Sequence, residues 1–378
     1  MPTTVVNAKV FDGVESRPWA SVRFDAGVIT AVGTAAQNGD DVVDARGGTL
    51  LPGLIDAHAH LIPGALQRSL NFGVTTVLDM FSTPEVVAAA RRQARTRGDV
   101  ADVRSSGIGA TAPGGHPSVM YPPFPTLAGP DEAERFVARR MAEGSDYLKV
   151  FAGPGGLWPA LDDATVAALA AAARASGLTV VAHVSSIAGL EHVVAAGVDV
   201  VAHVPADADL PARLVERIAA AGIVVGPTLA TIVGTRGGAS AVAERNVRRL
   251  ADAGVVLLAG TDAPNPAADF GVGLHRELQS LVRAGTSPAQ ALAAATSAAA
   301  RAFRLDDRGR IAVGLRADLL LVSGDPLVDI AATLGIERIW RAGAPFERRP
   351  FVPTAAEAEE LAVFDARVAA AVAAVRRR

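Results

Sequence analysis

The chain of 378 residues contains no cysteine. Disulfide bonds and thiolate metal ligands are therefore excluded, so any metal ion must be held by histidine, by carboxylate or by a less usual ligand. Aromatic residues are also scarce, at 4%, whereas hydrophobic residues make up 50% of the chain. This balance favours helices packed on buried parallel strands over an aromatic-rich sandwich.

An excess of one charge sign is missing as well. Lys and Arg together number 36 against 39 Asp and Glu, which gives a formal net charge of −3. No basic face therefore suggests a nucleic-acid partner or an anionic membrane. The sequence also has no signal-peptide pattern and no uninterrupted apolar run long enough to span a membrane. We expect a cytoplasmic protein with a small-molecule substrate, and a homo-oligomer stays open.

Short apolar runs alternate with Ala-rich segments of helical period between residues 50 and 305. Between the runs lie helical segments such as Asp163–Ser176 and Ile187–Ala196, which Gly177 and Gly197 can end in the left-handed conformation. Eight strand-and-helix units predict an α/β fold, a (β/α)₈ TIM-type barrel over residues 51–309, with reactive residues where the strands end. The expected strands are Leu50–Ala57, Val74–Met80, Val103–Ala110, Tyr147–Ala152, Thr179–Val184, Val200–Val204, Ile223–Ala230 and Val255–Ala259.

Strand-like segments also flank this region. Residues 1–50, with turn signals at Asp12-Gly13 and Asn38-Gly39, and residues 310–352 each offer too little apolar face to be stable alone. We expect the two segments to pair in one small β-sandwich domain. Residues 353–378 predict a terminal amphipathic helix that ends in three arginines, whose charge suits a helix C-terminus.

Polar residues close several of the apolar strands. His58 and His60 lie two residues apart, and on an extended strand such residues point the same way and can reach one metal ion, although an isolated pair is weak evidence. His183 and His203 end the fifth and sixth strands, and Asp262 follows the eighth. If these histidines were simply buried in the core, each would need a separate partner. One shared cation would satisfy them together.

Four further residues are candidates for the same end of the barrel. Lys149 lies inside an apolar strand, and because buried lysines are almost never unpaired it either pairs with a carboxylate or has a chemical role. His116 lies in the long loop after the third strand, where loops are usually functional, although a surface histidine is an equal reading. Tyr121 and Trp158 lie in neighbouring loops and suggest an apolar or aromatic substrate pocket, unless such aromatics only order the loops. His116, Tyr121 and Trp158 are the expected substrate contacts.

Four motifs resemble the amidohydrolase superfamily, in its imidazolonepropionase-like and prolidase-like branch. They are GTLLPGLIDAHAH at 48–60, GVTTV at 73–77, GRI at 309–311 and GLRAD at 314–318. The resemblance covers nearly the whole chain. It implies a binuclear metal centre, in which the ligands of the more buried ion are His58, His60 and Asp262, and those of the more exposed ion are His183 and His203.

The resemblance also assigns chemistry to single residues. Lys149 matches the family lysine that carries a carboxylate on its amine, as N6-carboxylysine, and bridges both ions. An apolar strand lowers the pKa of this lysine, which leaves a neutral amine able to take up carbon dioxide. Asp262 matches a ligand that accepts a proton from the bridging hydroxide and passes it to the leaving amine.

The activity that follows is hydrolysis of an amide or peptide-like C–N bond by a hydroxide held between two divalent ions. Suitable substrates are an N-acyl amino acid, a dipeptide ending in proline or a cyclic amide. Histidine and carboxylate ligands suit Zn²⁺ best, although Mn²⁺, Fe²⁺, Co²⁺ and Ni²⁺ are compatible. The same centre would also cleave an ester, a lactone or a carbamate. A catalytically inactive scaffold is the third hypothesis, and the presence of all six ligand residues argues against it.

Overall fold

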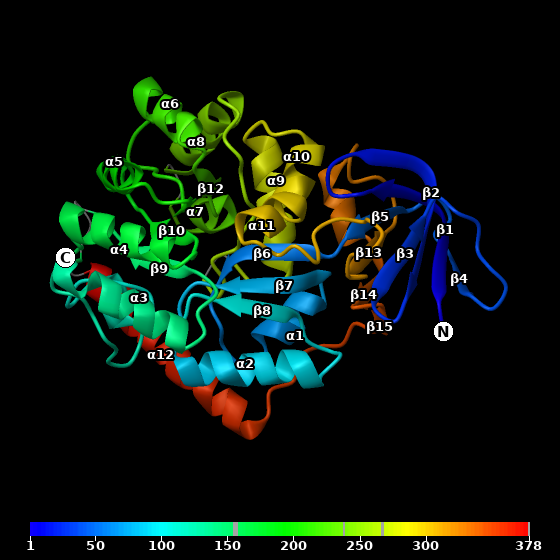
Figure 1. Ribbon diagram of the computed structural model, residues 1–378, viewed down its shortest axis with the longest axis horizontal. Helices are drawn as coiled ribbons and strands as arrows, with labels where there is room; N and C mark the ends of the chain where they lie inside the picture. Colours follow the sequence, from blue (N-terminus) through cyan, green and yellow to red (C-terminus); the bar gives the residue numbers. More distant parts are fainter. Residues whose placement is uncertain (154–157, 237–238, 266–267, 377–378) are drawn as a thin grey trace.

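The computed structural model is a mixed α/β protein with a larger and a smaller part (Figure 1). It describes residues 1–378 except for 154–157, 237–238, 266–267 and 377–378. Helices surround parallel strands in the larger part, and strands from both ends of the chain build the smaller part. Among the described residues, no helix has the length and apolar character needed to cross a membrane.

The larger part contains two parallel sheets in the described chain. One consists of β6 (Leu54–Ala59), β7 (Val74–Asp79) and β8 (Asp102–Ser105), and the other of β9 (Leu148–Phe151), β10 (Val180–His183), β11 (Val200–Ala202) and β12 (Val224–Gly226). Strands β6, β7 and β9 are buried along their whole length. Parallel strands with both faces covered by helices have this pattern.

Backbone hydrogen bonds join the two sheets after β8. The N–H of Ala110 donates to the carbonyl of Lys149 at 2.8 Å, and the N–H of Phe151 donates to the carbonyl of Ala110 at 2.8 Å. The residues that follow β8 therefore continue beside β9 as an isolated parallel bridge.

A second junction lies at residues 255–259, which the sequence predicts as the eighth strand. The N–H of Leu258 donates to the carbonyl of Val225 at 2.9 Å, and the N–H of Ala57 donates to the carbonyl of Ala259 at 2.9 Å. This segment thus bonds to β12 on one side and to β6 on the other, although it forms an isolated bridge and not a regular strand.

Helices follow the strands and pack outside them. Local signals fix their ends: the side chain of Asp162 accepts the N–H of Thr165 at the start of α4, and Gly197 ends α5 with φ of 73°, which suits a residue without a side chain. The helices are α1 (Ala65–Leu70), α2 (Pro84–Thr96), α3 (Ala133–Ala142), α4 (Asp163–Ala175), α5 (Ile187–Ala196), α6 (Ala212–Ala220), α7 (Leu229–Arg236), α8 (Ala239–Asp252), α9 (Val272–Arg283), α10 (Pro288–Ala294) and α11 (Ser297–Ala302). Short 3₁₀ turns are η1 (His116–Val119), η2 (Pro130–Glu132) and η3 (Ile330–Leu334).

The smaller part is one mixed sheet of eight strands in the described chain, with the order β15-β14-β13-β5-β1-β2-β3 and with β4 beside β1. Strand β13, from the C-terminal segment, pairs antiparallel with β5, from the N-terminal segment. The strands enclose an apolar cluster in which the rings of Phe24 and Trp340 lie 5.7 Å apart. The hydrogen bonds of these strands therefore form one continuous sheet, where the sequence predicts a β-sandwich. Its strands are β1 (Thr3–Phe11), β2 (Ser16–Asp25), β3 (Val28–Val32), β4 (Asp41–Asp44), β5 (Thr49–Pro52), β13 (Leu319–Val322), β14 (Ile336–Arg341) and β15 (Ala344–Phe346).

The prediction of a single strand over residues 50–57 was wrong. Strand β5 ends at Pro52 in the mixed sheet, and β6 begins at Leu54 in the parallel sheet. Between them, the N–H of Gly53 donates to the carbonyl of Asp318 at 2.7 Å. A Cβ at Gly53 would lie 2.3 Å from Oγ1 of Thr75, so only glycine lets the chain pass from one sheet to the other at this point.

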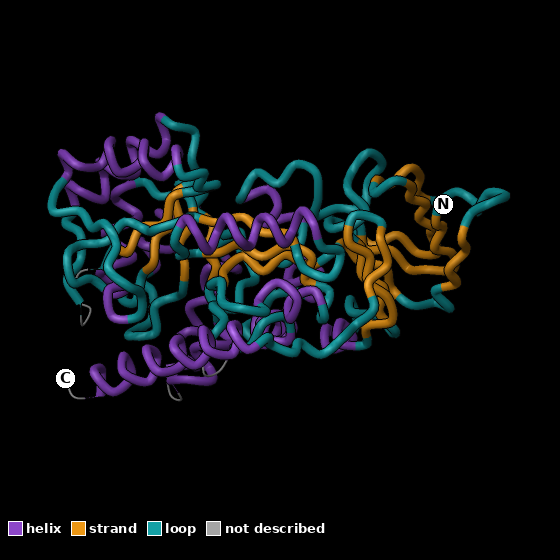
Figure 2. The backbone as a smooth tube through the Cα atoms, turned by 90° about the horizontal axis from the view of Figure 1, so that it is seen from below, coloured by secondary structure: helices purple, strands orange, loops and turns teal. Residues whose placement is uncertain are grey.

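Helix α12 (Ala355–Arg376) runs along one face of the larger part, outside its strands (Figure 2). Half-buried positions recur every three or four residues along it and mark the side that faces the protein. Between residues 357 and 368 they are Glu357, Leu361, Phe364 and Val368. The segment before α12 is tied to the end of α1, because Nε of Arg348 donates to the carbonyl of Asn71 at 2.8 Å.

Candidate metal centre

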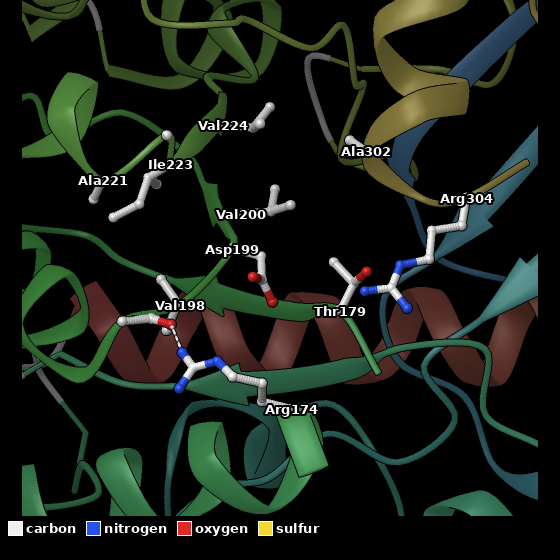
Figure 3. A pocket seen from close by; sticks show the side chains of 12 residues that line it. Arg174, Thr179, Val198, Asp199, Val200, Ala221, Ile223, Val224, Ala302 and Arg304 are labelled. Carbon is white, nitrogen blue, oxygen red and sulfur yellow. Dashed lines mark hydrogen bonds between the residues drawn. The ribbon is translucent and has the colours of Figure 1, made fainter. Parts of the chain in front are cut away.

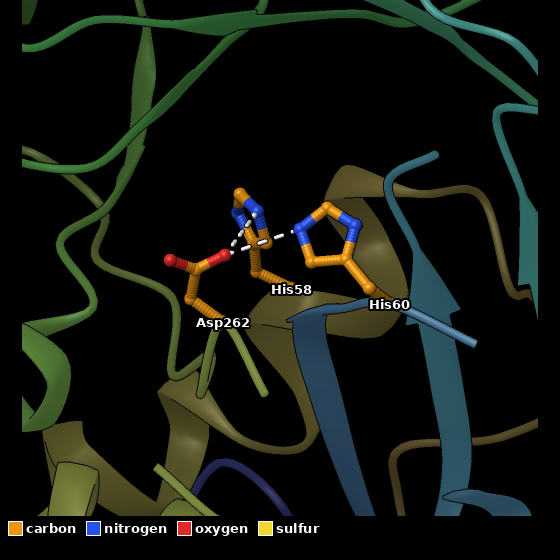
Figure 4. Close-up of side chains that lie close together, drawn as sticks. All are labelled: His58, His60 and Asp262. Carbon is orange, nitrogen blue, oxygen red and sulfur yellow. Dashed lines mark hydrogen bonds and ion pairs between the residues drawn. The ribbon is translucent and has the colours of Figure 1, made fainter. Parts of the chain in front are cut away.

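Three expected ligands form a compact group (Figure 4). One side-chain atom from each of His58, His60 and Asp262 lies within 4.8 Å of the other two. Oδ1 of Asp262 is 3.3 Å from Nε2 of His58 and 3.2 Å from Nε2 of His60. Burial lowers the pKa of His58 well below its usual range. Although burial opposes it, contacts with the two imidazoles hold the pKa of Asp262 well below its usual range. The ionised carboxylate of Asp262 and the neutral imidazole of His58 are therefore ready metal ligands.

Two more histidines lie beside this group. His183 ends β10 and His203 follows β11, and their ring centroids are 4.6 Å apart. The ring of His203 is also 4.8 Å from that of His58. Burial lowers the pKa of His183 well below its usual range and that of His203 to about 4. Four imidazoles from three strand ends therefore meet at one place, and burial lowers the pKa of His58, His183 and His203.

Lys149 lies in β9 and is 1% exposed. Its Nζ has no hydrogen-bond partner among the described residues, and it lies 5.5 Å from the centre of the Phe151 ring. Pairing with a carboxylate was one of the two alternatives for Lys149, and no such partner is found in the described part of the chain. Burial lowers the pKa of Lys149 to about 7. An unpartnered buried amine is costly.

The backbone is left-handed at three points of this rim. His203 has φ of 73°, Thr228 of 49° and Asp262 of 57°. Residues with a side chain rarely adopt such angles, which cost about 1–3 kcal/mol each and cluster at functional sites. The conformation directs His203 and Asp262 to the centre. It had no counterpart in the sequence pattern.

Hydroxyl groups contact the second nitrogen of two of the histidines. Oη of Tyr121 is 3.1 Å from Nδ1 of His60, and Oγ1 of Thr228 is 2.7 Å from Nδ1 of His203. Tyr121 is one of the expected substrate contacts, and its ring packs against Phe81 with centroids 4.2 Å apart. Thr228 was missed by sequence reasoning, because its only signal is a position just after a strand.

Buried carboxylates hold the loops that carry the ligands. Oδ1 of Asp56 accepts the N–H of His58 at 3.1 Å and the N–H of Thr261 at 3.0 Å. Oδ1 of Asp79 accepts the N–H of Leu61 at 3.0 Å. Burial raises the pKa of Asp56 to about 6 and raises that of Asp79. The contacts of Asp56 connect β6 with Thr261, 205 positions away in sequence, and that of Asp79 connects β7 with the loop after β6.

The other two expected substrate contacts differ in how the structure describes them. His116 lies in η1, with its ring stacked on those of His183, 5.1 Å away, and Phe151, 6.1 Å away. Nδ1 of His116 is buried and has no hydrogen-bond partner among the described residues. Trp158 is half-buried and directly follows residues 154–157, which lie outside the described residues.

His275, on α9, contacts residues outside the candidate metal centre. Its Nδ1 is 2.9 Å from Oγ1 of Thr333, and its Nε2 is 2.8 Å from the carbonyl of Phe72. Burial lowers the pKa of His275 to about 4. Both ring nitrogens are thus engaged in the core, and His275 has a structural role.

A cavity of about 430 Å³ opens beside the centre, between α12 and the loops at the strand ends. Ile62, Pro264 and Asn265 line one side, and Leu361 and Phe364 of α12 line the other. The lining reaches the candidate site, because Nδ2 of Asn265 donates to Oδ2 of Asp262 at 3.0 Å.

A second cavity, of about 340 Å³, lies at the opposite ends of the strands (Figure 3). Thr179 and Asp199, which line it, precede β10 and β11, whereas His183 ends β10 and His203 follows β11. Arg174 also lines it and donates to the carbonyl of Gly197 at 2.8 Å. This cavity is separate from the candidate metal centre.

Comparison with known proteins agrees with this geometry. Residues 49–346 match the model of the amidohydrolase family. An imidazolonepropionase of Streptomyces griseus subsp. griseus is 27% identical over 362 residues, which cover 84% of this chain and 89% of the relative. An imidazolonepropionase of Anaeromyxobacter sp. (strain K) is 30% identical over 341 residues, covering 75% and 77%.

The fold is also similar to that of solved structures. A crystal structure of a Xaa-Pro dipeptidase with bound methionine has a TM-score of 0.81 at 22% identity, and the match covers 92% of this chain and 100% of the other. At that identity the likeness concerns the fold. The family expected from the sequence motifs is confirmed, since the family model spans most of the chain: this protein belongs to the amidohydrolase family.

Proposed function

We propose that this protein is a metal-dependent hydrolase that cleaves an amide or peptide-like C–N bond of a small molecule. One observation carries the proposal: His58, His60 and Asp262 converge within 4.8 Å at the strand ends of an amidohydrolase-family chain. Strand ends of this kind are where barrel enzymes place their reactive groups. The candidate substrates are an N-acyl amino acid, a dipeptide ending in proline and a cyclic amide.

The donor set fits two divalent ions, with Zn²⁺ as the first choice for histidine and carboxylate ligands. One ion would be held by His58, His60 and Asp262, and the other by His183 and His203. Lys149, as N6-carboxylysine, would bridge them, which is supported by its unpartnered Nζ and its pKa of about 7. When bound, such ions polarise a carbonyl group and make water a nucleophile near neutral pH.

Asp262 would move the proton. Its low pKa keeps the carboxylate ionised, so it can accept a proton from the attacking water and deliver it to the leaving nitrogen. Both oxygens are oriented: Oδ1 by His58 and His60, and Oδ2 by the Nδ2 of Asn265. A fixed carboxylate of this kind can serve both halves of the reaction.

We infer that the larger part closes as the (β/α)₈ barrel that the sequence predicts. The inference rests on the hydrogen bonds that join residues after β8 to β9, β12 to residues 255–259, and residues 255–259 to β6. In the same proposal, residues 1–50 and 310–352 form the small β domain, residues 51–309 the barrel and residues 353–378 the C-terminal helix.

Substrate would reach the centre beside α12, through the cavity of about 430 Å³. We propose His116, Tyr121 and Trp158 as substrate contacts, and His116 has the firmest support because its buried Nδ1 lacks a partner among the described residues. The ring of Phe81 packs against Tyr121 and that of Phe151 stacks on His116, and the centroids of the two phenylalanine rings are 5.9 Å apart. An apolar or aromatic substrate group fits these surroundings.

The test combines metal analysis with a matched substrate screen. Protein purified without added metal is expected to contain about two divalent ions per chain by elemental analysis. The reconstituted enzyme is then assayed with N-acyl amino acids, dipeptides ending in proline and cyclic amides, each beside its ester or lactone counterpart. Amide turnover that chelators abolish supports the proposal. A strong preference for every ester over its amide would replace it with ester or lactone hydrolysis, and no turnover by a fully loaded protein would favour the inactive scaffold.

A further inference from the structure

Thr228 has the backbone conformation of the ligand positions without being one of them. It lies just after β12, is 1% exposed and has φ of 49°. A β-branched residue at positive φ is a genuine outlier, because its branched Cβ crowds the backbone. Such a conformation persists only where the surrounding structure holds it in place. The contacts of the next two residues show what holds it.

Glu277, on α9, supplies that support. It is fully buried, and its carboxylate accepts two backbone N–H groups, from Leu229 to Oε1 at 2.9 Å and from Ala230 to Oε2 at 2.7 Å. These are the first two residues of α7, whose N–H groups have no partner within the helix. Burial raises the pKa of Glu277 to about 8, although both N–H contacts favour its charged form. Both oxygens of Glu277 are thus used to fix the turn that begins with Thr228.

The same turn is joined to the loop of Asp262. Oγ1 of Thr231 donates to the carbonyl of Thr261 at 2.7 Å. The Thr261 hydroxyl in turn donates to Oδ2 of Asp56 at 2.7 Å. The start of α7 is therefore a fixed point between the strand end that carries Asp262 and the strand end that carries His203.

We propose that Thr228 and Glu277 are positioning residues for His203, an inference that rests on the proposed metal centre. Glu277 holds the first turn of α7, and that turn places Oγ1 of Thr228 2.7 Å from Nδ1 of His203. With the proton on Nδ1 donated to this oxygen, Nε2 of His203 is free to bind a metal ion. The hydrogen bond of one ring nitrogen determines which nitrogen can be a ligand.

The chain offers a matched control for this hydrogen bond. Thr333 lies against His275 at a similar distance, with its Oγ1 2.9 Å from Nδ1, and is also fully buried. There the hydroxyl donates to Nδ1, because Nε2 of His275 donates to the carbonyl of Phe72. His275 is no part of the metal centre. Replacing either threonine by valine keeps the branched shape and removes only the hydroxyl, so the two variants differ in which histidine loses its partner.

The experiment measures Zn²⁺ binding to the metal-free, full-length protein, by competition with a chromophoric chelator in bicarbonate buffer. Thr228→Val is expected to bind one of its two ions about 10- to 100-fold more weakly, the usual effect of removing such a partner. Thr228→Ser keeps the hydroxyl and is expected to bind both ions as the wild type does. Thr333→Val is expected to leave both affinities unchanged, whatever it does to the unfolding midpoint.

Glu277→Gln gives a second, independent test, because the amide keeps one acceptor oxygen and loses the other. The ion whose affinity falls in Thr228→Val is expected to bind more weakly in Glu277→Gln too, while the other ion keeps its affinity. If Thr228→Val and Glu277→Gln lower only the unfolding midpoint of the metal-free protein and bind both ions as the wild type does, the two residues are structural and the inference is wrong. A wild-type protein that binds fewer than two ions would instead contradict the binuclear proposal itself, so the two failures are distinguishable.

Discussion

Replacing Lys149 by Met should make the metal-free protein more stable while removing a proposed metal ligand. The amine has a pKa of about 7 in the folded chain, against an ordinary value of 10.5. At about 1.36 kcal/mol for each pKa unit, burial of the ammonium opposes folding by roughly 4 kcal/mol at pH 7, where about half of the folded chains are already neutral. Methionine has a similar length and no charge to bury. We therefore expect Lys149→Met to raise the free energy of unfolding of the metal-free protein by about 2–4 kcal/mol.

The sign of the pH dependence follows from the same two pKa values. Below pH 7 both the folded and the unfolded chain hold the proton, so the full penalty opposes folding. Between pH 7 and 10.5 the folded chain loses the proton first, and the wild type becomes more stable as pH rises. The advantage of Lys149→Met should therefore be largest below pH 7 and shrink toward pH 10.5.

Urea unfolding of chelator-treated proteins at pH 6, 7 and 9, in buffer free of carbon dioxide, measures this difference. Lys9 is the matched control, since it is the other lysine of the chain, is 38% exposed and pairs with Asp325. Lys9→Met is expected to change stability by less than about 1 kcal/mol, with no such trend. A Lys149→Met protein that is less stable than the wild type, or a difference that does not change with pH, would refute the reasoning.

Three further predictions concern turnover, access and the junction between the sheets. Asp262→Asn keeps the shape of the side chain but cannot accept the proton. We expect kcat to fall by about 10²- to 10⁴-fold while circular dichroism shows an intact fold. Unchanged turnover would remove Asp262 from the mechanism. Phe364→Ala widens the cavity beside α12 and is expected to raise KM several-fold with little effect on kcat. Val363→Ala, at a residue that is 48% exposed, serves as the control. Equal KM values in the two variants would place substrate entry elsewhere. Gly53→Ala puts a Cβ 2.3 Å from Oγ1 of Thr75. We expect it to lower the free energy of unfolding, measured in urea, by about 1–3 kcal/mol. An unchanged free energy of unfolding would show that β5 and β6 can shift apart.

The family and the side chains proposed as ligands were accessible from the sequence because their signals are local. A histidine pair spaced by two residues at a strand end, and a lysine within an apolar run, are properties of a few neighbouring residues. The alternation of apolar runs and helical segments is also local, and it predicted parallel strands followed by helices. The cytoplasmic location and a homo-oligomer stay predictions.

Contacts between distant residues were decided by the tertiary structure alone. The sequence predicts one strand over residues 50–57, and only the close approach of Thr75 and Asp318 to Gly53 shows that this segment serves two different sheets. Thr228 and Glu277 are 49 positions apart and carry no motif, so their contact with the turn beside His203 depends on how α7 and α9 pack. Periodicity specifies which face of a strand or helix is buried, but the partner of a buried polar group is fixed only when the elements are packed together.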